Sequence, residues 1–126
     1  MSETFKLEIV RPDKKILSEE AHEVILPCYE GQLTILKNHI PFITFLRPGI
    51  IEIKDKSKIF VEDGTVEFYE NNLLVLSTTA INLENLDKNE ISKKLTEAEK
   101  LLTKNEISDK QRYLLNYKID TLNSLN

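Results

Sequence analysis

Up to about Ile81, the apolar residues of the chain alternate with polar ones or gather in short runs. Phe5, Leu7 and Ile9 alternate with charged residues, which directs one set of side chains to a core and the other to water. Similar short runs follow along the chain as EVILP, QLTIL, FITFL, IIEI, KIFV, TVEFY and NLLVLS. Many short strands separated by turns predict a β-sandwich or a β-barrel.

Turn-forming residues separate these runs: Arg11-Pro12-Asp13, Glu30-Gly31, Arg47-Pro48-Gly49, Asp55-Lys56-Ser57, Asp63-Gly64 and Glu70-Asn71-Asn72. Asp63-Gly64 is a good hairpin signal, because both residues tolerate positive φ. Proline cannot donate to a strand ladder, so Pro27, Pro41 and Pro48 mark strand ends or edges. The interruptions therefore predict the corners of a compact antiparallel structure.

The pattern changes after Ile81, and residues 82–126 contain no glycine and no proline. Asp87 and Ser108 are each followed three residues later by Glu90 and Gln111, as at helix N-caps with a reciprocating third residue. Two apolar stripes at helical spacing follow these caps, the first with Ile91, Leu95, Ala98 and Leu102, and the second with Leu114, Leu115, Ile119, Leu122 and Leu125. We expect two antiparallel helices, connected by residues 104–106.

Isolated helices of this length are marginal in water. The helical hairpin must therefore pack on the β-half of the chain or on another protein. An element with two docking surfaces can act as a switch.

Length and charge narrow the class of protein. A chain of 126 residues fits one domain, or one domain with a small appendage. Seventeen basic and twenty-one acidic residues give a net charge of −4, which argues against nucleic-acid binding. We find neither a membrane-spanning apolar stretch nor a signal peptide. The lone Cys28 cannot form an internal disulfide, as expected in a reducing, cytoplasmic compartment.

The residues that carry most enzyme chemistry are scarce. The chain has two histidines, His22 and His39, and one cysteine, with no metal-ligand spacing among them. Three glycines exclude a glycine-rich phosphate loop. We therefore expect no catalytic residues, no metal and no cofactor. We expect an exposed His22 and a half-buried Cys28, while His39 either bonds local backbone or serves an interface.

The stretch EGQLTILKNHIPFITFLRPGIIEI, residues 30–53, resembles the signature of the ε subunit family of F-type ATP synthases. The matching positions are Glu30-Gly31, His39-Ile40-Pro41 and Arg47-Pro48-Gly49. Further on, FVEDGTVEFYENNLLVLSTTAI resembles the next hairpin of that family, which closes here with Thr79-Ala80-Ile81. The resemblance covers nearly the whole chain, densely in the β-half and loosely in the helices.

The resemblance implies an N-terminal antiparallel β-sandwich, residues 1–84, and a C-terminal two-helix antiparallel hairpin, residues 85–126. Members of the family sit in the central stalk, bind the γ subunit and the c-ring, and couple proton flow to ATP synthesis without catalysing a reaction. The expected location is the cytoplasmic face of the bacterial inner membrane, as a peripheral protein attached only through the complex.

The resemblance also assigns residues to the interface with the c-ring and γ: Glu30, Gly31, Gln32, His39 and Pro41. Gln32 departs from the acidic residue that some relatives carry at that position, which weakens the case for an ion pair there. Asp63 likewise stands where many relatives have the first glycine of a pair.

The hairpin of bacterial relatives can extend into the catalytic head and block ATP hydrolysis. This contact uses basic residues of the second helix, here Lys110, Arg112 and Lys118, which face acidic residues of the catalytic β subunit. Asp109 and Asp120 partly offset these charges, so we expect mild inhibition at most.

Some relatives also bind ATP at the hairpin, through an aspartate followed three residues later by an arginine. Leu86-Asp87 matches the start of that motif, but Glu90 takes the place of the arginine. A carboxylate would repel the phosphates, so we expect weak or absent ATP binding.

Two other readings stay open from the residues alone. The chain is either a free-standing β-sandwich that binds a small ligand or a peptide, with the helices as a dimerisation arm, or a small enzyme. A fold of this class hosts many functions, and the enzyme reading lacks a nucleophile–base pair.

Overall fold

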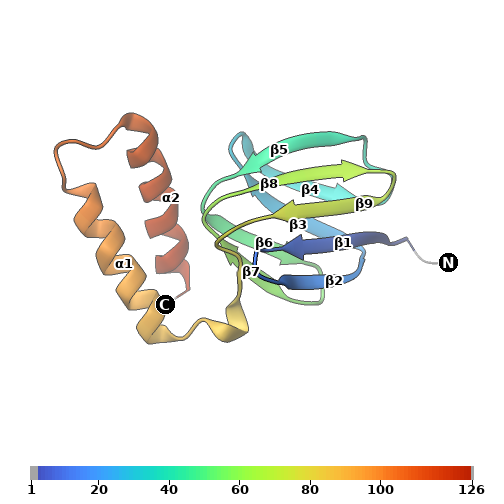
Figure 1. Ribbon diagram of the computed structural model, residues 1–126, viewed down its shortest axis with the longest axis horizontal. Helices are drawn as coiled ribbons and strands as arrows, with labels where there is room; N and C mark the ends of the chain where they lie inside the picture. Colours follow the sequence, from blue (N-terminus) through green and yellow to red (C-terminus); the bar gives the residue numbers. More distant parts are fainter. Residues whose placement is uncertain (1–2, 126) are drawn as a thin grey trace.

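The computed structural model describes residues 3–125. Within them, ten strands precede a short 3-10 helix and two α-helices (Figure 1). The strands are β1 (Phe5–Val10), β2 (Lys15–Ala21), β3 (Glu23–Cys28), β4 (Gly31–Leu36), β5 (Phe42–Leu46), β6 (Gly49–Ile53), β7 (Lys58–Val61), β8 (Gly64–Tyr69), β9 (Asn72–Leu76) and β10 (Ile81–Asn82). The helices are η1 (Leu83–Asn85), α1 (Lys88–Leu102) and α2 (Asp109–Ser124).

The strands form two packed layers, which confirms the predicted β-sandwich (Figure 1). The hydrogen-bonded path runs β10-β7-β6-β3-β5-β8-β9-β1-β2, with β4 beside β3. It passes from one layer to the other where Cys28 of β3 pairs with Leu46 of β5. Alternating side chains such as Phe5, Leu7 and Ile9 are fully buried between the layers, as the period of two predicts.

The strands are not all antiparallel. β1 pairs in parallel with β9, from Lys6 opposite Asn72 to Val10 opposite Leu76. The prediction of an antiparallel sandwich is wrong for this pair and correct for the other strand pairs of the described residues. Alternation of apolar residues specifies which face of a strand is buried, but it does not specify strand direction.

The hairpin predicted at Asp63-Gly64 is also wrong. β7 pairs with β6 and β10, whereas β8 pairs with β5 and β9, so the chain crosses between the layers at this point. Gly64 allows a close approach, because a Cβ there would lie 2.8 Å from the backbone oxygen of Leu76. The true hairpin of this region joins β8 to β9 through Glu70 and Asn71, both at positive φ.

The two α-helices begin at the predicted caps. The side chain of Asp87 accepts a hydrogen bond from the Glu90 amide at 2.8 Å. Ser108 and Gln111 form a complete capping box, with bonds of 3.1 and 2.8 Å.

The hairpin lies beside one end of the sandwich (Figure 1). There Ile91 and Leu122 pack with Leu86 against Phe60 of β7. This apolar seam, made of those four residues, joins the two parts of the chain.

Candidate interaction surfaces

The groups with the most chemical reactivity are occupied by structural contacts. One ring nitrogen of His39, Nδ1, lies 2.8 Å from the backbone oxygen of Ile40, so the ring bonds local backbone as one of the two readings expected. Cys28 is more deeply buried than predicted, and this burial raises the pKa of its thiol. His22 is exposed, as expected. No group of acidic, histidine and cysteine side chains within residues 3–125 could hold a metal ion.

The residues assigned to the rotor interface lie at opposite ends of β4. Glu30 and Gln32 are exposed at the start of this strand, beside Gly31 with its φ of +123°. His39 and Pro41 follow the other end of the same strand. Six residues of extended chain separate the two groups by roughly 17 Å. The structure therefore places these residues in two separate sites rather than one.

The end that carries Glu30 lies against α2. The hydroxyl of Tyr113 donates a hydrogen bond to the backbone oxygen of Tyr29 at 3.0 Å. The two rings are stacked with their centroids 6.1 Å apart. The loop therefore carries exposed polar residues on a backbone that the hairpin supports.

The end that carries His39 is a rigid tip. Asn38 and Asn71, from two neighbouring turns, exchange hydrogen bonds of 2.7 and 3.0 Å. The His39 ring meets Phe42 and Phe68 edge-on, with centroid distances of 5.2 and 6.0 Å. His39 thus closes one end of the core while its loop stays at the surface.

An exposed face with apolar residues extends from this tip along β5 and reaches β9, with Thr65 and Glu67 of the intervening β8 between them. The side chains of Ile43 and Phe45 are 75% and 58% exposed, and Leu76 is also exposed. Large exposed apolar residues gathered on one face of a sheet indicate a site of protein contact. We call this patch, made of Ile43, Phe45 and Leu76, the apolar face.

Sequence reasoning missed the apolar face. The signal was present in FITFL, where Ile43 and Phe45 alternate with Phe42 and Leu46. Such a strand has apolar side chains on both of its faces. One face packs in the sandwich, so the other needs a partner outside it.

A hollow of about 780 Å³ lies where the apolar face meets the hairpin. Phe45 and Leu76 line it from the sandwich, and Lys110 and Leu114 line it from α2. On the side of Lys110 and Leu114, α2 is therefore separated from the sheet, while Tyr113 bonds Tyr29 and the lower part of α2 packs in the apolar seam.

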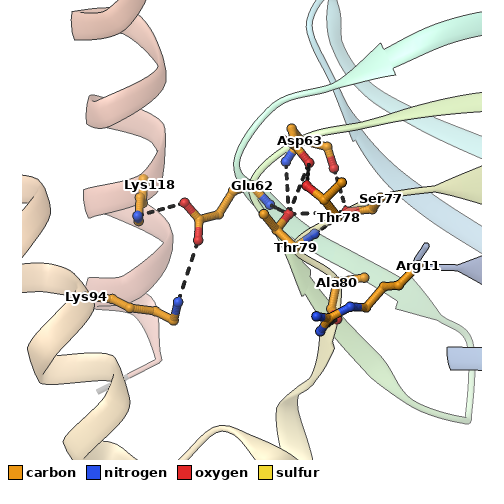
Figure 2. A network of polar contacts seen from close by, with 9 residues as sticks. All are labelled: Arg11, Glu62, Asp63, Ser77, Thr78, Thr79, Ala80, Lys94 and Lys118. Carbon is orange, nitrogen blue, oxygen red and sulfur yellow. Dashed lines mark hydrogen bonds and ion pairs between the residues drawn. The ribbon is translucent and has the colours of Figure 1, made fainter. Parts of the chain in front are cut away.

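Glu62 connects the sandwich to both helices (Figure 2). One carboxylate oxygen lies 2.7 Å from Nζ of Lys118 on α2, and the other lies 3.7 Å from Nζ of Lys94 on α1. Next to it, Oγ1 of Thr79 accepts hydrogen bonds from the backbone amides of Glu62 and Asp63 at 2.9 and 3.3 Å. These polar contacts fix the corner at which the chain crosses between the layers.

The three basic residues of α2 that are predicted to contact the catalytic β subunit have different surroundings. Lys118 is only 18% exposed, because it pairs with Glu62. Nζ of Lys110 lies 5.9 Å from the centroid of the Tyr29 ring, and Arg112 is exposed. In the docked hairpin, Lys118 is therefore the least accessible of the three.

The fold, the apolar face and the docked hairpin define a protein that presents surfaces to other proteins. Residues 4–83 match the family model of the ATP synthase delta/epsilon chain β-sandwich domain. The chain is 49% identical to the ATP synthase epsilon chain of Pelagibacter ubique, over the full length of both. It is 29% identical to that of Rhizobium etli, over 86% of this chain and 84% of the relative. The chain belongs to the ATP synthase delta/epsilon family.

Solved structures support the same fold. A chain of the Euglena gracilis mitochondrial ATP synthase superposes with a TM-score of 0.75 at 21% identity, covering 99% of this chain and 81% of that one. A chain of the Tetrahymena thermophila mitochondrial ATP synthase central stalk and c-ring gives a TM-score of 0.66 at 14% identity, covering 95% and 94%. None of the helices described in residues 3–125 is long and apolar enough to cross a membrane.

Proposed function

We propose that the chain is a rotor subunit of the ATP synthase central stalk, which binds the γ subunit and the c-ring and passes torque between them. It does so without a chemical step of its own. The observation that carries this proposal is the apolar face, exposed on a sandwich whose interior is closely packed. A close-packed core resists deformation, as a contact under load requires.

The two ends of β4 suit different partners. His39 and Pro41 adjoin the exposed Ile40 and the apolar face. These apolar surroundings favour γ as the partner of His39 and Pro41. Glu30, Gly31 and Gln32 form a polar loop that suits the polar loops of the c-ring. The chain then attaches to the cytoplasmic face of the bacterial inner membrane only through these contacts.

Charge placed on the apolar face tests this assignment. Ile43→Glu should weaken binding to an isolated γ–c-ring assembly by at least about tenfold, because a carboxylate would be desolvated at the contact. The side chain is exposed in the free chain, so folding should be unaffected. Lys54→Glu, at an exposed site in the β6–β7 turn, is the control. Unchanged binding by Ile43→Glu would remove the apolar face from the interface.

The hairpin contributes regulation. Lys110, Arg112 and Lys118 are the residues of α2 that would meet the catalytic β subunit after undocking, and Asp109 and Asp120 reduce their net charge. We expect mild inhibition of ATP hydrolysis. Deletion of residues 85–126 should change the ATPase rate of the assembled enzyme less than about threefold, a barrier change below 1 kcal/mol. A many-fold rise in rate would contradict this.

We expect weak or absent ATP binding because of the residues that stand in the ATP motif at the start of α1. The Asp87 carboxylate already caps the helix, and Glu90 adds a second negative charge beside it. Titration calorimetry of the isolated chain should detect no binding at sub-millimolar ATP. A sub-millimolar dissociation constant would overturn the assignment.

A further inference from the structure

The docked hairpin is held by few buried side chains. Of the two helices, the described residues that are buried are Ile91, Ala98 and Leu122. Towards the α1–α2 connection, the hollow opens between α2 and the sheet, and α2 contacts the sandwich there through Tyr113 on Tyr29 and Tyr117 on Arg47. The apolar seam alone therefore fixes only the lower end of the hairpin, and polar contacts contribute to the balance between docked and undocked states.

Glu62 makes the polar contact that involves both helices. Its two oxygens face lysines from different helices, Lys118 at 2.7 Å and Lys94 at 3.7 Å (Figure 2). The three side chains are 24%, 18% and 28% exposed. Because they are partly removed from water, their attraction is screened less than that of a fully exposed pair.

The backbone next to Glu62 is held by hydrogen bonds that do not involve the hairpin. Its amide donates to Thr79 Oγ1, and the hydroxyl of Ser77 donates to the backbone oxygen of Asp63 at 2.8 Å. These bonds join residues of the sandwich only. The carboxylate is thus presented by the rigid part of the molecule to the part that moves.

We propose that Glu62 is an internal acidic clasp, which keeps the hairpin docked by occupying Lys118 and Lys94. The clasp takes the place that an acidic surface of another protein would occupy on Lys118. Since Lys118 is covered while Arg112 is exposed, the hairpin can offer its full set of cations only after the clasp opens. This last step rests on the proposed function, whereas the clasp itself does not.

Thiol labelling measures opening of the docked interface, even when the open state is rare. In a Cys28→Ala background, Ala98→Cys places a reporter of nearly unchanged size at a fully buried position of α1, and its rate of reaction with DTNB follows the fraction of molecules in which the hairpin opens. Glu62→Gln should raise this rate about fivefold, the effect of losing one or two partly exposed ion pairs. Glu52→Gln removes a carboxylate from a pair with Lys58 within the sandwich and should leave the rate unchanged.

Further variants separate a clasp from general destabilisation. Lys118→Met should raise the rate as Glu62→Gln does, and the double variant should fall short of the product of the two effects. Lys93→Met, which removes an exposed cation of α1, should have no effect. A second reporter, Ile35→Cys in the sandwich core, should label at the same rate with and without Glu62→Gln.

An unchanged rate with Glu62→Gln, an equal rise with Glu52→Gln, or a parallel rise at the Ile35→Cys reporter would overturn the clasp. On the assembled enzyme, Glu62→Gln should deepen inhibition of ATP hydrolysis about twofold or more, as a larger undocked fraction predicts. If the labelling result holds and the ATPase rate does not change, the clasp stands and the proposed contact of Lys118 with the catalytic subunit fails.

Discussion

The sandwich and the hairpin are built from similar residues but are stabilised in different ways. In the sandwich, long-range strand pairs surround a continuous core that includes Phe5, Leu26, Ile35 and Phe68. In the hairpin, each helix carries one apolar stripe; the lower end packs in the apolar seam, and further up α2 meets the sandwich through single side-chain contacts of Tyr113 and Tyr117. The first arrangement resists local opening, whereas the second has a small docking free energy. A rotor subunit can use both properties, one to transmit force and the other to regulate.

The strongest test of this contrast is Phe68→Ala in the core. Phe68 is buried, stacks on Phe42 and meets Phe5 edge-on at 5.7 Å. Its loss should destabilise the sandwich by about 3–5 kcal/mol, measured as a lower urea midpoint in circular dichroism. Phe45→Ala, on the exposed side of the same layer, should change the midpoint little. Equal effects would mean that the two faces are packed alike.

Leu122→Ala should release the hairpin and leave the sandwich folded. The side chain is fully buried in the apolar seam, and its removal costs about 2–5 kcal/mol of docking free energy. Hydrogen exchange should therefore accelerate in α1 and α2, because undocked helices of this length fray, while β-sheet amides keep their protection. A matching loss of protection in the sheet would show that hairpin and sandwich unfold as one unit.

Arg47→Ala should have a smaller effect on the docking of the hairpin to the sandwich. The guanidinium carbon of Arg47 lies 3.8 Å from the centroid of the Tyr117 ring, so the basic residue of the Arg-Pro-Gly turn also holds α2. We expect a loss of about 0.5–2 kcal/mol in docking, seen as faster hydrogen exchange of α2. Arg112→Ala, at an exposed site on α2, is the control. Indistinguishable exchange in the two variants would exclude a docking role for Arg47.

The smallest expected effect is a dependence on alkaline pH at Cys28. Burial raises the pKa of its thiol, while the nearby Arg47 partly opposes this shift. A raised pKa favours the protonated thiol in the folded state, so its contribution is complete below the ordinary thiol pKa and is lost as pH rises through the raised value. The urea midpoint should fall less above about pH 9 in Cys28→Ala than in the natural chain. Identical pH profiles would contradict this.

The sequence predicted the architecture more completely than it predicted the interaction surfaces. Alternation and turn residues predicted the sandwich, and the capping residues Asp87 and Ser108 predicted both helix starts. These features are local, since periodicity and caps depend on neighbours within a few residues. Asp63-Gly64 misled the same reasoning, because a local turn signal cannot tell a hairpin from a crossing between layers.

The assigned interface residues show the same limit. Motif order grouped Glu30 with His39, yet an extended strand keeps them apart. Glu62 and Lys118 are far apart in sequence, and no spacing rule relates them, but the docked hairpin brings them to 2.7 Å.

The amino-acid order by itself determined which segments are strands and which are helices, and it carried enough of a family pattern to indicate a rotor subunit. Only the tertiary structure decided the parallel pairing of β1 with β9, the exposed apolar face and the contact of Glu62 with two lysines. The physical reason is that periodicity and capping act over a few residues, whereas strand partners and side-chain contacts depend on how distant segments bury their surfaces together.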